Sequence, residues 1–555
     1  MRDKDEFYDV LAEISGRPFD RYQKIAGDFD FSRYVLKINE VQPAVDADPT
    51  LLVLRAPQSV AGFPPHLFST PIRRTALEDV LTRQMGVAID ARAGSRRLSV
   101  ARPSPQILPR TSMVVTEEFV EARVYVSLPS RDGRVDGELA TRIFFEELPQ
   151  VATAALVYAY LDPRLLDRAV SVMEDADFVR QRLAEKRLVA FVADGAILPR
   201  NGQTGAPLPG AVPFESPAEL RVDFALPSGR TVYGMGVPAG VTAIIGGAKQ
   251  GKSTLLSAIR EGVYNHAPGD GRELVVTLPD TVQVDAEPGR SVQRVDISGF
   301  YSELPGGVDT AAFDTPCACV ATSQAAGVIE ALEAGAGALL FDEDTSAPSL
   351  FGADAALQQL AGHSSVALRP LASQLRPLWQ QRQISSVVAT ATCSQYLAQA
   401  DTVILLEDFR PRHATAAARE LIAPPPAAAG APLVPRDRSV IAATLDPSRG
   451  RDDHAIRTRN HLIEFGRDLI DLAALPQLVD PAQVETIGLI LYYAKLRYME
   501  EGTTLSSVLD FIDRDLGMEG LECLSRELRG DLARPRRFEV AAALNRLRSL
   551  RVRSV

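Results

Sequence analysis

Long apolar stretches are missing from this chain of 555 residues, and no run of eighteen apolar residues occurs in it. This absence excludes an ordinary membrane-spanning helix, so we expect no membrane partner. The first ten residues, MRDKDEFYDV, are acidic and polar. They lack the basic segment and the apolar segment of a secretory signal. We therefore expect the protein to be cytoplasmic.

Cysteine is scarce as well, which limits covalent and metal cross-links. The four cysteines are too few to staple a chain of this length. They are Cys317, Cys319, Cys393 and Cys523. The C-x-C pair has no second Cys or His pair nearby at metal-ligand spacing, so we expect reduced thiols rather than a disulfide or a metal site.

Positive charge is carried almost entirely by arginine, because lysine is rare. Two of the few lysines, Lys249 and Lys252, lie in one glycine-rich loop. The formal net charge of −11 does not by itself indicate nucleic-acid binding, although local basic segments matter more than the total. Hydrophobic residues make up 46% and charged residues 24%, as in a globular protein of two to four domains.

The pattern of strands, helices and proline-rich stretches divides the chain into four segments. Residues 1–165 read as a mixed α/β N-terminal domain, and residues 166–422 alternate strands with helices as a parallel α/β core does. The stretch APPPAAAGAPLVP at 423–435 reads as a linker. Residues 436–555 carry apolar residues at helical spacing, which predicts a helical C-terminal domain. The expected fold class is α/β.

The strongest motif is the stretch VTAIIGGAKQGKSTLLSAI. A β-branched strand runs into a G-x-x-x-x-G-K-S loop and then into a helix, which is the arrangement of a P-loop. Its backbone N–H groups would surround the phosphates, Lys252 would bridge the β- and γ-phosphates, and Ser253 would bind Mg²⁺. The residues expected to contact the nucleotide are Gly246, Gly247, Ala248, Lys249, Gln250, Gly251, Lys252, Ser253 and Thr254.

A second motif, ALLFDED at 338–344, places acids directly after a buried strand. The carboxyl ends of strands are where α/β sheets bind ligands. There Asp342 can hold Mg²⁺, and Glu343 can act as the general base toward the attacking water. The two motifs together predict an enzyme that hydrolyses ATP with Mg²⁺ and uses Glu343 and Lys252 as its catalytic residues.

Two further patterns invite other interpretations. Asp296-Ile297-Ser298-Gly299 fits the D-x-x-G of GTPases. Guanine recognition, however, normally needs a further lysine with an aspartate close to it. Lys495 is the only lysine after Lys252, and it has no such aspartate. A GTPase is therefore disfavoured. Leu304-Pro305-Gly306-Gly307 lies far upstream of Asp342 and reads as a type II turn.

The segments GVYNHAPGDGRE, VDISGF, LPGGVDT, EALEAGAG and DEDTSA resemble a family of ABC-class ATPases that stand alone, without a transporter permease. LVAFVADGAILPR before the P-loop and ARPRRFEVAAALNRLRSLRV near the end resemble the same family. The resemblance implies a P-loop core of ABC type between two family-specific domains. It also implies a homodimer, in which the signature loop of one subunit completes the ATP site of the other. Asp296 is a further candidate for sensing Mg²⁺ or water.

The chain departs from the family pattern at several places. Cys319-Val320-Ala321 stands where the family has a Ser-Gly signature, and Val320 would crowd an approaching phosphate. The switch segment 387–396 has no histidine; Thr392 or Ser394 could touch the γ-phosphate there, or simply cap the next helix. The segment 349–354 also differs from the family. These departures weaken the expectation of hydrolysis more than that of ATP binding.

Single-stranded RNA is one expected partner, because the family hints at RNA binding and two arginine-rich segments could contact phosphates. The first holds Arg92, Arg96, Arg97, Arg102 and Arg110. The second holds Arg526, Arg529, Arg534, Arg536, Arg537, Arg546, Arg548, Arg551 and Arg553. Aromatic residues are sparse in both, and solvated helix faces explain the arginines equally well. The alternative function is an ATP-gated protein assembly or remodelling switch without nucleic acid. A transporter subunit fits poorly.

Overall fold

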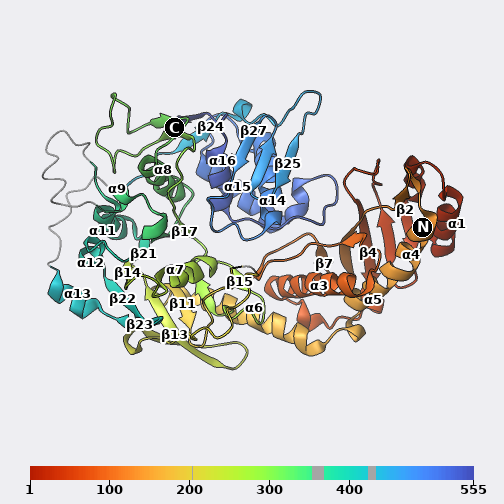
Figure 1. Cartoon of the computed structure of the whole chain (residues 1–555), viewed down its shortest axis with the longest axis horizontal. Coiled ribbons are helices and arrows are strands. Elements are labelled where there is room, and N and C mark those ends of the chain that lie inside the picture. The colour runs from red at the N-terminus through yellow and green to blue at the C-terminus, as the bar shows by residue number, and fades with distance from the viewer. Residues whose placement is uncertain (203, 353–367, 423–432, 555) are drawn as a thin grey trace. The chain divides into compact units, whose positions relative to one another are not determined.

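The computed structural model describes residues 1–202, 204–352, 368–422 and 433–554 (Figure 1). These residues form two compact units, which we describe separately. Residues 1–174 and 521–534 make the first unit, and residues 175–520 and 535–555 make the second.

The expected linker at 423–435 falls mostly outside the described residues, which resume at residue 433. Residues 353 and 354 of the divergent segment 349–354 also lie outside them. The domain limits expected after residues 165 and 422 therefore stay predictions.

A mostly antiparallel sheet is the centre of the first unit. Its order is β1-β2-β3-β4-β8-β5, with β7 paired to β8. The strands are β1 (Arg2–Asp3), β2 (Gly27–Asp30), β3 (Val35–Ile38), β4 (Thr50–Pro57), β5 (Leu98–Ser99), β7 (Met113–Val115) and β8 (Phe119–Val126). β4 and β8 pair along their whole length. Leu52, Leu54 and Val124 are buried on one face, and Val53, Glu121 and Arg123 are buried on the other, so the centre of this pair is covered on both faces.

Helices complete this unit. They are α1 (Lys4–Ile14), α3 (Pro71–Arg92), α4 (Gly137–Arg142) and α5 (Leu148–Leu156). The long helix α3 begins where the Thr70 hydroxyl accepts the N–H of Arg73, and Pro71 fits its first position. The late segment 521–534 joins the unit: the Arg123 guanidinium donates to the carbonyl of Arg529 at 2.8 Å.

A mainly parallel sheet is the centre of the second unit. Its order is β17-β20-β21-β14-β22-β23, and only β23 runs antiparallel to its neighbour. The strands are β14 (Val241–Ile245), β17 (Thr281–Gln283), β20 (Ala338–Asp342), β21 (Ser385–Thr390), β22 (Thr402–Glu407) and β23 (Arg410–His413). β20 and β21 are buried at every position, because helices cover both faces of the sheet.

Alternating residues of β14 divide between those two faces. Ile244 packs with Leu255 and Leu256 of helix α7 (Lys252–Glu261), whereas Ala243 packs with Ala400 and Ala418 on the other face. The helices of this region also include α8 (Val320–Glu333), α9 (Pro348–Phe351), α11 (Leu371–Arg382), α12 (Gln395–Gln399) and α13 (Thr415–Leu421). Figure 1 shows α7 beside this sheet.

Strand register brings the two sequence motifs to one edge of the sheet. Ile245, the last residue of β14, lies beside Thr390 of β21. Asp342, the last residue of β20, lies beside Ala389 of the same strand. The P-loop, the acids after β20 and the segment after β21 therefore leave the sheet side by side, although they lie far apart in the sequence.

A second, antiparallel sheet has the order β12-β13-β11-β16; its first three strands in the sequence precede the P-loop, and β16 follows α7. Its strands are β11 (Leu188–Ala193), β12 (Arg221–Ala225), β13 (Thr231–Pro238) and β16 (Val275–Thr277). The long helix α6 (Pro163–Leu183) leads into it, and Val179 and Leu183 of this helix pack on Phe191 of β11.

The C-terminal part holds the expected helices and also strands that the sequence analysis did not predict. The helices are α14 (Pro481–Arg497), α15 (Leu505–Met518) and α16 (Arg537–Arg546). The strands β25 (Ile456–Arg459), β26 (Leu462–Phe465) and β27 (Asp468–Asp471) form a small antiparallel sheet, and β24 (Arg438–Val440) pairs with β28 (Val552–Ser554). In the part of the chain that is described, no helix is both long and apolar enough to cross a bilayer.

Candidate nucleotide site

The loop between β14 and α7 has a backbone that only glycine allows at two places. Gly246 has a φ of 147°, and a Cβ there would lie 2.5 Å from the carbonyl oxygen of Leu406. Gly251, directly before α7, has a φ of 95°. Lys249 also adopts a positive φ, of 61°. Turns of this kind point successive N–H groups to one side, which suits an anion.

Lys252 is the first residue of α7, so its side chain stands at the positive end of a ten-residue helix. Its ammonium group donates to the carbonyl of Gly247 at 2.9 Å, across the mouth of the loop. A phosphate bound by the loop would therefore meet the loop N–H groups, the helix end and the Lys252 charge together.

The residues expected to bind Mg²⁺ lie together. The Ser253 hydroxyl hydrogen-bonds to the Asp342 carboxylate, which is 7% exposed. Burial raises the pKa of Asp342, and the bonds from Ser253 and from the Asp344 N–H oppose that rise. A hydroxyl oxygen facing a carboxylate is an oxygen donor set that suits Mg²⁺, which would also relieve the burial of the charge.

Glu343 faces the segment after β21. Its carboxylate accepts the hydroxyls of Thr390, at 2.8 Å, and of Thr392. It also accepts the backbone N–H groups of Ala391, at 2.5 Å, and of Thr392, at 3.2 Å. Partial burial raises the pKa of Glu343, but these four donors outweigh it and hold the pKa below its ordinary value.

This arrangement limits what Glu343 can do as it stands. A carboxylate whose two oxygens already accept four hydrogen bonds is a weak base, because proton transfer to it must break some of them. It remains ionised at neutral pH and could take a proton from water once the 390–392 segment moves.

The expected signature segment lies at the start of helix α8. Cys319 caps the helix and exchanges hydrogen bonds with Thr322, and both Cys317 and Cys319 are exposed. Burial would raise the pKa of the Cys319 thiol, but the bonds from Thr322 and Ala321 lower it. Val320 is 41% exposed at the first helical position, so a bulky apolar group stands where a small residue was expected.

Asp296 and Ser394 are two further sequence candidates. Asp296 accepts the N–H and the hydroxyl of Ser298 and pairs with Arg436 at 2.6 Å. Ser394 occupies the N-cap position of α12, but its side chain makes no capping hydrogen bond. The contact of Thr392 or Ser394 with a γ-phosphate stays a prediction.

Sequence reasoning missed the contacts that the strand ends create. The interaction of Thr390 and Thr392 with Glu343 joins residues 47 and 49 positions apart. Gln250 of the P-loop accepts the N–H of Asp408 at 2.6 Å, across 158 positions, which ties the loop to the β22–β23 hairpin. In the sequence β22 is apolar, but β23 is Arg-Pro-Arg-His, so no apolar pattern signals that hairpin.

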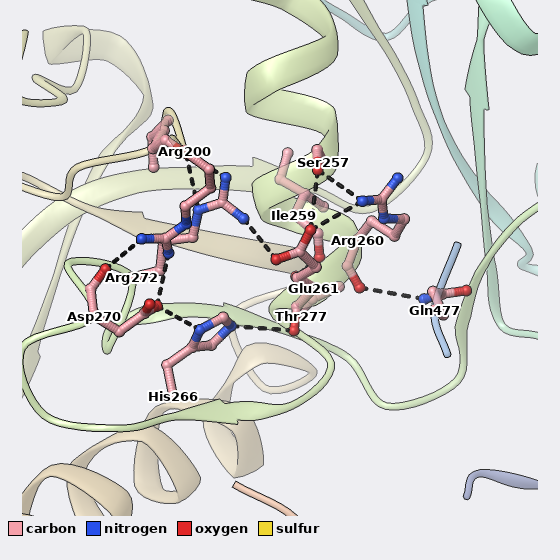
Figure 2. Close-up of polar contacts among 11 residues, drawn as sticks. Arg200, Ser257, Ile259, Arg260, Glu261, His266, Asp270, Arg272, Thr277 and Gln477 are labelled. Carbon is pink, nitrogen blue, oxygen red and sulfur yellow. Dashed lines mark hydrogen bonds and ion pairs between the residues drawn. The ribbon is translucent and has the colours of Figure 1, made fainter. Parts of the chain in front are cut away.

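A buried polar network fixes the far end of α7 (Figure 2). Glu261, the last residue of the helix, accepts hydrogen bonds from Arg272 at 2.8 Å and from Arg260 at 2.9 Å. Burial lowers the pKa of Arg272 to about 10. The Gln477 amide donates to the carbonyl of Arg260 at 3.2 Å. The P-loop helix is therefore tied at its carboxyl end to the C-terminal part of the same unit.

Three family models match successive parts of the chain. The model described as the N-terminal part of ATPases of the ABC class matches residues 4–159. The P-loop domain model of the ABC ATPases matches residues 162–432. The model described as the MRB1590 C-terminal domain matches residues 456–553. The P-loop model covers the P-loop, Asp342, Glu343 and the 390–392 segment.

Among curated proteins, the chain is similar to the uncharacterized protein MJ1628 of Methanocaldococcus jannaschii. The two are 28% identical over 267 residues, which is 45% of this chain and 56% of that relative. The chain thus spans little more than half the length of that relative, whose printed name assigns no activity.

Proposed function

The chain belongs to the ATPases of the ABC class that carry a characteristic N-terminal domain, and on that premise we propose that it binds ATP with Mg²⁺ and hydrolyses it. One observation carries this proposal: Ser253 of the P-loop helix and Asp342 at the end of β20 are hydrogen-bonded to each other. That pair unites the loop that suits phosphate with the strand end that suits a metal ion.

Each residue has a distinct task in the proposed reaction. The loop N–H groups and Lys252 hold the phosphates and balance their charge. Ser253 and Asp342 hold Mg²⁺, which supplies charge neutralisation at the phosphate oxygens. Glu343 accepts a proton from the attacking water, after Thr390 and Thr392 release its carboxylate. Release of Glu343 is the step that we expect to limit turnover.

Pairing of two chains is part of the proposal. The N-terminal end of α8 is exposed at Cys319 and Val320, so it is available to a second copy. The positive end of this helix would face the γ-phosphate bound by the partner chain. Val320 would keep the helix end farther from the γ-phosphate than glycine would. We therefore expect Val320 to slow hydrolysis more than it weakens ATP binding.

We propose RNA as the partner that stimulates the ATPase. The first unit contains an open hollow of about 590 Å³ whose lining includes Arg33, Arg92, Phe145 and Tyr160. Tyr160 is 60% exposed, and Arg33 lies over its ring at 5.9 Å. Cations beside exposed aromatic rings suit a single strand, whose bases stack and whose phosphates need positive charge.

The other arginines contribute less to this surface. Arg102 pairs with Asp90 at 2.6 Å, and several C-terminal arginines pair with nearby acids in the same way. The acids are Asp531 for Arg529, Glu539 for Arg536, Asp510 for Arg537, Glu287 for Arg546 and Glu501 for Arg553. These contacts neutralise much of the charge that the sequence displays, so Arg92 with Arg33 is the more promising phosphate contact.

A second candidate function is an ATP-gated assembly or remodelling switch that hydrolyses slowly and binds no nucleic acid. The engagement of Glu343 by four donors favours it, because a switch needs ATP binding more than turnover. In that case closure of two chains on ATP would itself be the output.

Steady-state ATP turnover of the full chain, with and without poly(U) RNA, separates these functions. An RNA-coupled ATPase requires turnover that RNA stimulates, that rising salt suppresses, and that Glu343→Gln abolishes. The matched control is Asp344→Asn, which changes the neighbouring exposed acid and should retain turnover. ATP binding with a near-zero rate that neither RNA nor Glu343→Gln changes would favour the switch.

A further inference from the structure

An apolar cavity adjoins the P-loop. It has a volume of about 290 Å³, and its lining includes Leu198, Leu208, Val212, Phe214 and Phe409 together with Gln250 and Thr254 of the loop and helix. The volume is near the lower end of ligand sites in proteins, roughly 300 Å³. The cavity is continuous with the phosphate-binding loop, because Gln250, Gly251 and Thr254 belong to both.

Phe409 stands at the edge of this cavity in a backbone conformation that disfavours a bulky residue. Asp408 and Phe409 form the two-residue turn between β22 and β23, with φ of 48° and 64°. Such turns normally use Asn-Gly, and a positive φ is an outlier for an aromatic residue. Phe409 is also 56% exposed, so burial does not explain its presence. Strain of this kind without burial points to a binding role.

The ring of Phe409 lies directly against the P-loop. A Cβ built on Gly251 would lie 3.4 Å from Cδ1 of this ring. The Gln250–Asp408 hydrogen bond holds the turn beside the loop. The ring therefore stands next to the first turn of α7, where the phosphate end of a nucleotide would give way to its sugar and base.

The part of the cavity wall around Leu198 is held by the network of Figure 2. The buried guanidinium of Arg272 donates to the carbonyl of Leu198 at 3.0 Å, and Arg200 pairs with Asp270 at 2.7 Å. Asp270 in turn lies 2.7 Å from Nδ1 of His266. The segment around Leu198 is thus anchored, so the cavity has one fixed wall and one exposed aromatic ring.

We propose that Phe409 stacks on the purine base of the nucleotide and that the cavity holds this base by shape and stacking rather than by edge hydrogen bonds. The proposal rests on the proposed binding of ATP at the P-loop. Among the described residues that line the cavity, Gln250 and Thr254 alone have polar side chains, and the Gln250 amide oxygen already accepts the Asp408 N–H. A site without edge partners discriminates poorly between bases. The site therefore takes GTP as well as ATP.

The test is equilibrium binding of ATP, GTP and inorganic tripolyphosphate, each with Mg²⁺, to the full chain and to Phe409→Gly. The glycine relieves the positive φ, so we expect the unfolding temperature of the free protein to rise. We expect the affinity for ATP and GTP to fall about tenfold and that for tripolyphosphate to stay unchanged. A purely structural Phe409 would not move stability and base affinity in opposite directions.

Two further variants sharpen the test. Phe409→Tyr keeps the ring and should keep both affinities, and Tyr233→Ala removes another exposed aromatic, in β13, and should change neither. Unchanged ATP affinity in Phe409→Gly, an equal loss of tripolyphosphate, or GTP binding over 100-fold weaker than ATP would overturn the proposal. Absence of all binding to the unmodified chain would instead overturn the proposed ATP site itself.

Discussion

The P-loop side and the Glu343 side of the site differ in whether their polar groups are free to contact a ligand. On the P-loop side, the glycines with positive φ, Lys252 at a helix end and the Ser253–Asp342 pair already lie together. On the other side, the carboxylate of Glu343 is occupied by the 390–392 segment. The same sheet edge therefore offers a formed binding surface and a restrained base.

Because of this difference, the proposed ATP binding and the proposed hydrolysis depend on separate groups. Binding needs groups that already face a ligand, whereas hydrolysis needs Glu343 to exchange four hydrogen bonds for one with water. A conformational step of this kind commonly sets the turnover rate of an enzyme.

Lys252→Ala should weaken ATP binding about 100-fold, or ~2.7 kcal/mol, because a charge-assisted contact to the phosphates is lost. Titration calorimetry of the full chain measures this. Lys495→Ala, in the last turn of α14, is the control and should bind as the unmodified protein does. Equal affinities of the two variants would contradict the assignment of Lys252.

Gly246→Ala should lower the free energy of unfolding of the second unit by about 2 kcal/mol, because alanine tolerates neither the φ nor the approach of the Leu406 carbonyl. Gly247→Ala is the matched control: its nearest neighbour would be Cγ of Gln250, at 3.7 Å. Urea unfolding of both variants checks the prediction. A similar midpoint for the two would show that the Gly246 geometry is not required.

Thr392→Val should raise the pKa of Glu343 toward its ordinary value, because one of the donors that lower it is removed. The acidic limb of the turnover profile should then move to higher pH. Turnover at pH 7 should rise a few-fold, because the base is less restrained. Thr392→Ser retains the hydroxyl and should keep the original profile.

The pH dependence of the free energy of unfolding should also reflect the lowered pKa of Glu343. A depressed folded pKa contributes stability above the unfolded value of about 4.3, and this contribution is lost as the pH falls through the folded value. Thr392→Val should therefore narrow the acidic range over which Glu343 stabilises the fold. Unfolding midpoints measured between neutral pH and pH 3 that coincide for the variant and the unmodified chain would contradict the role of Thr392.

Val320→Gly should raise turnover two- to threefold, roughly, by letting a second chain approach the γ-phosphate more closely. Val308→Gly is the control, since Val308 has the same 41% exposure and lies outside α8. The effect should grow with protein concentration if the signature acts between two chains. A gain that is independent of concentration would place the effect within one chain.

Sequence alone predicts the features that local patterns encode. The P-loop motif and the apolar strand before Asp342 are each recognised from residues that are close together in the sequence. Both elements and the α/β class can therefore be predicted, and the family models agree with this class. The contacts of Glu343 with Thr390 and Thr392 depend on strand order, which no local pattern reveals. The strands β25–β27 are short, and their apolar alternation covers only four residues each.

The arginine-rich segments are a second case in which sequence alone does not reveal long-range contacts. Arg546 and Arg553 look like free basic charge in the sequence, but tertiary contacts place Glu287 and Glu501 beside them. The strain at Phe409 is likewise invisible, because a residue type does not state its φ. Long-range pairing and backbone conformation are therefore what the structure adds.

The most direct test of the account is the affinity of the full chain for ATP measured with Mg²⁺ and with EDTA, beside Asp342→Asn. We predict that Mg²⁺ tightens ATP binding at least about tenfold in the unmodified chain, and that this dependence disappears in Asp342→Asn while metal-free binding remains. An affinity that is the same with and without Mg²⁺ in the unmodified chain would contradict the Ser253–Asp342 site.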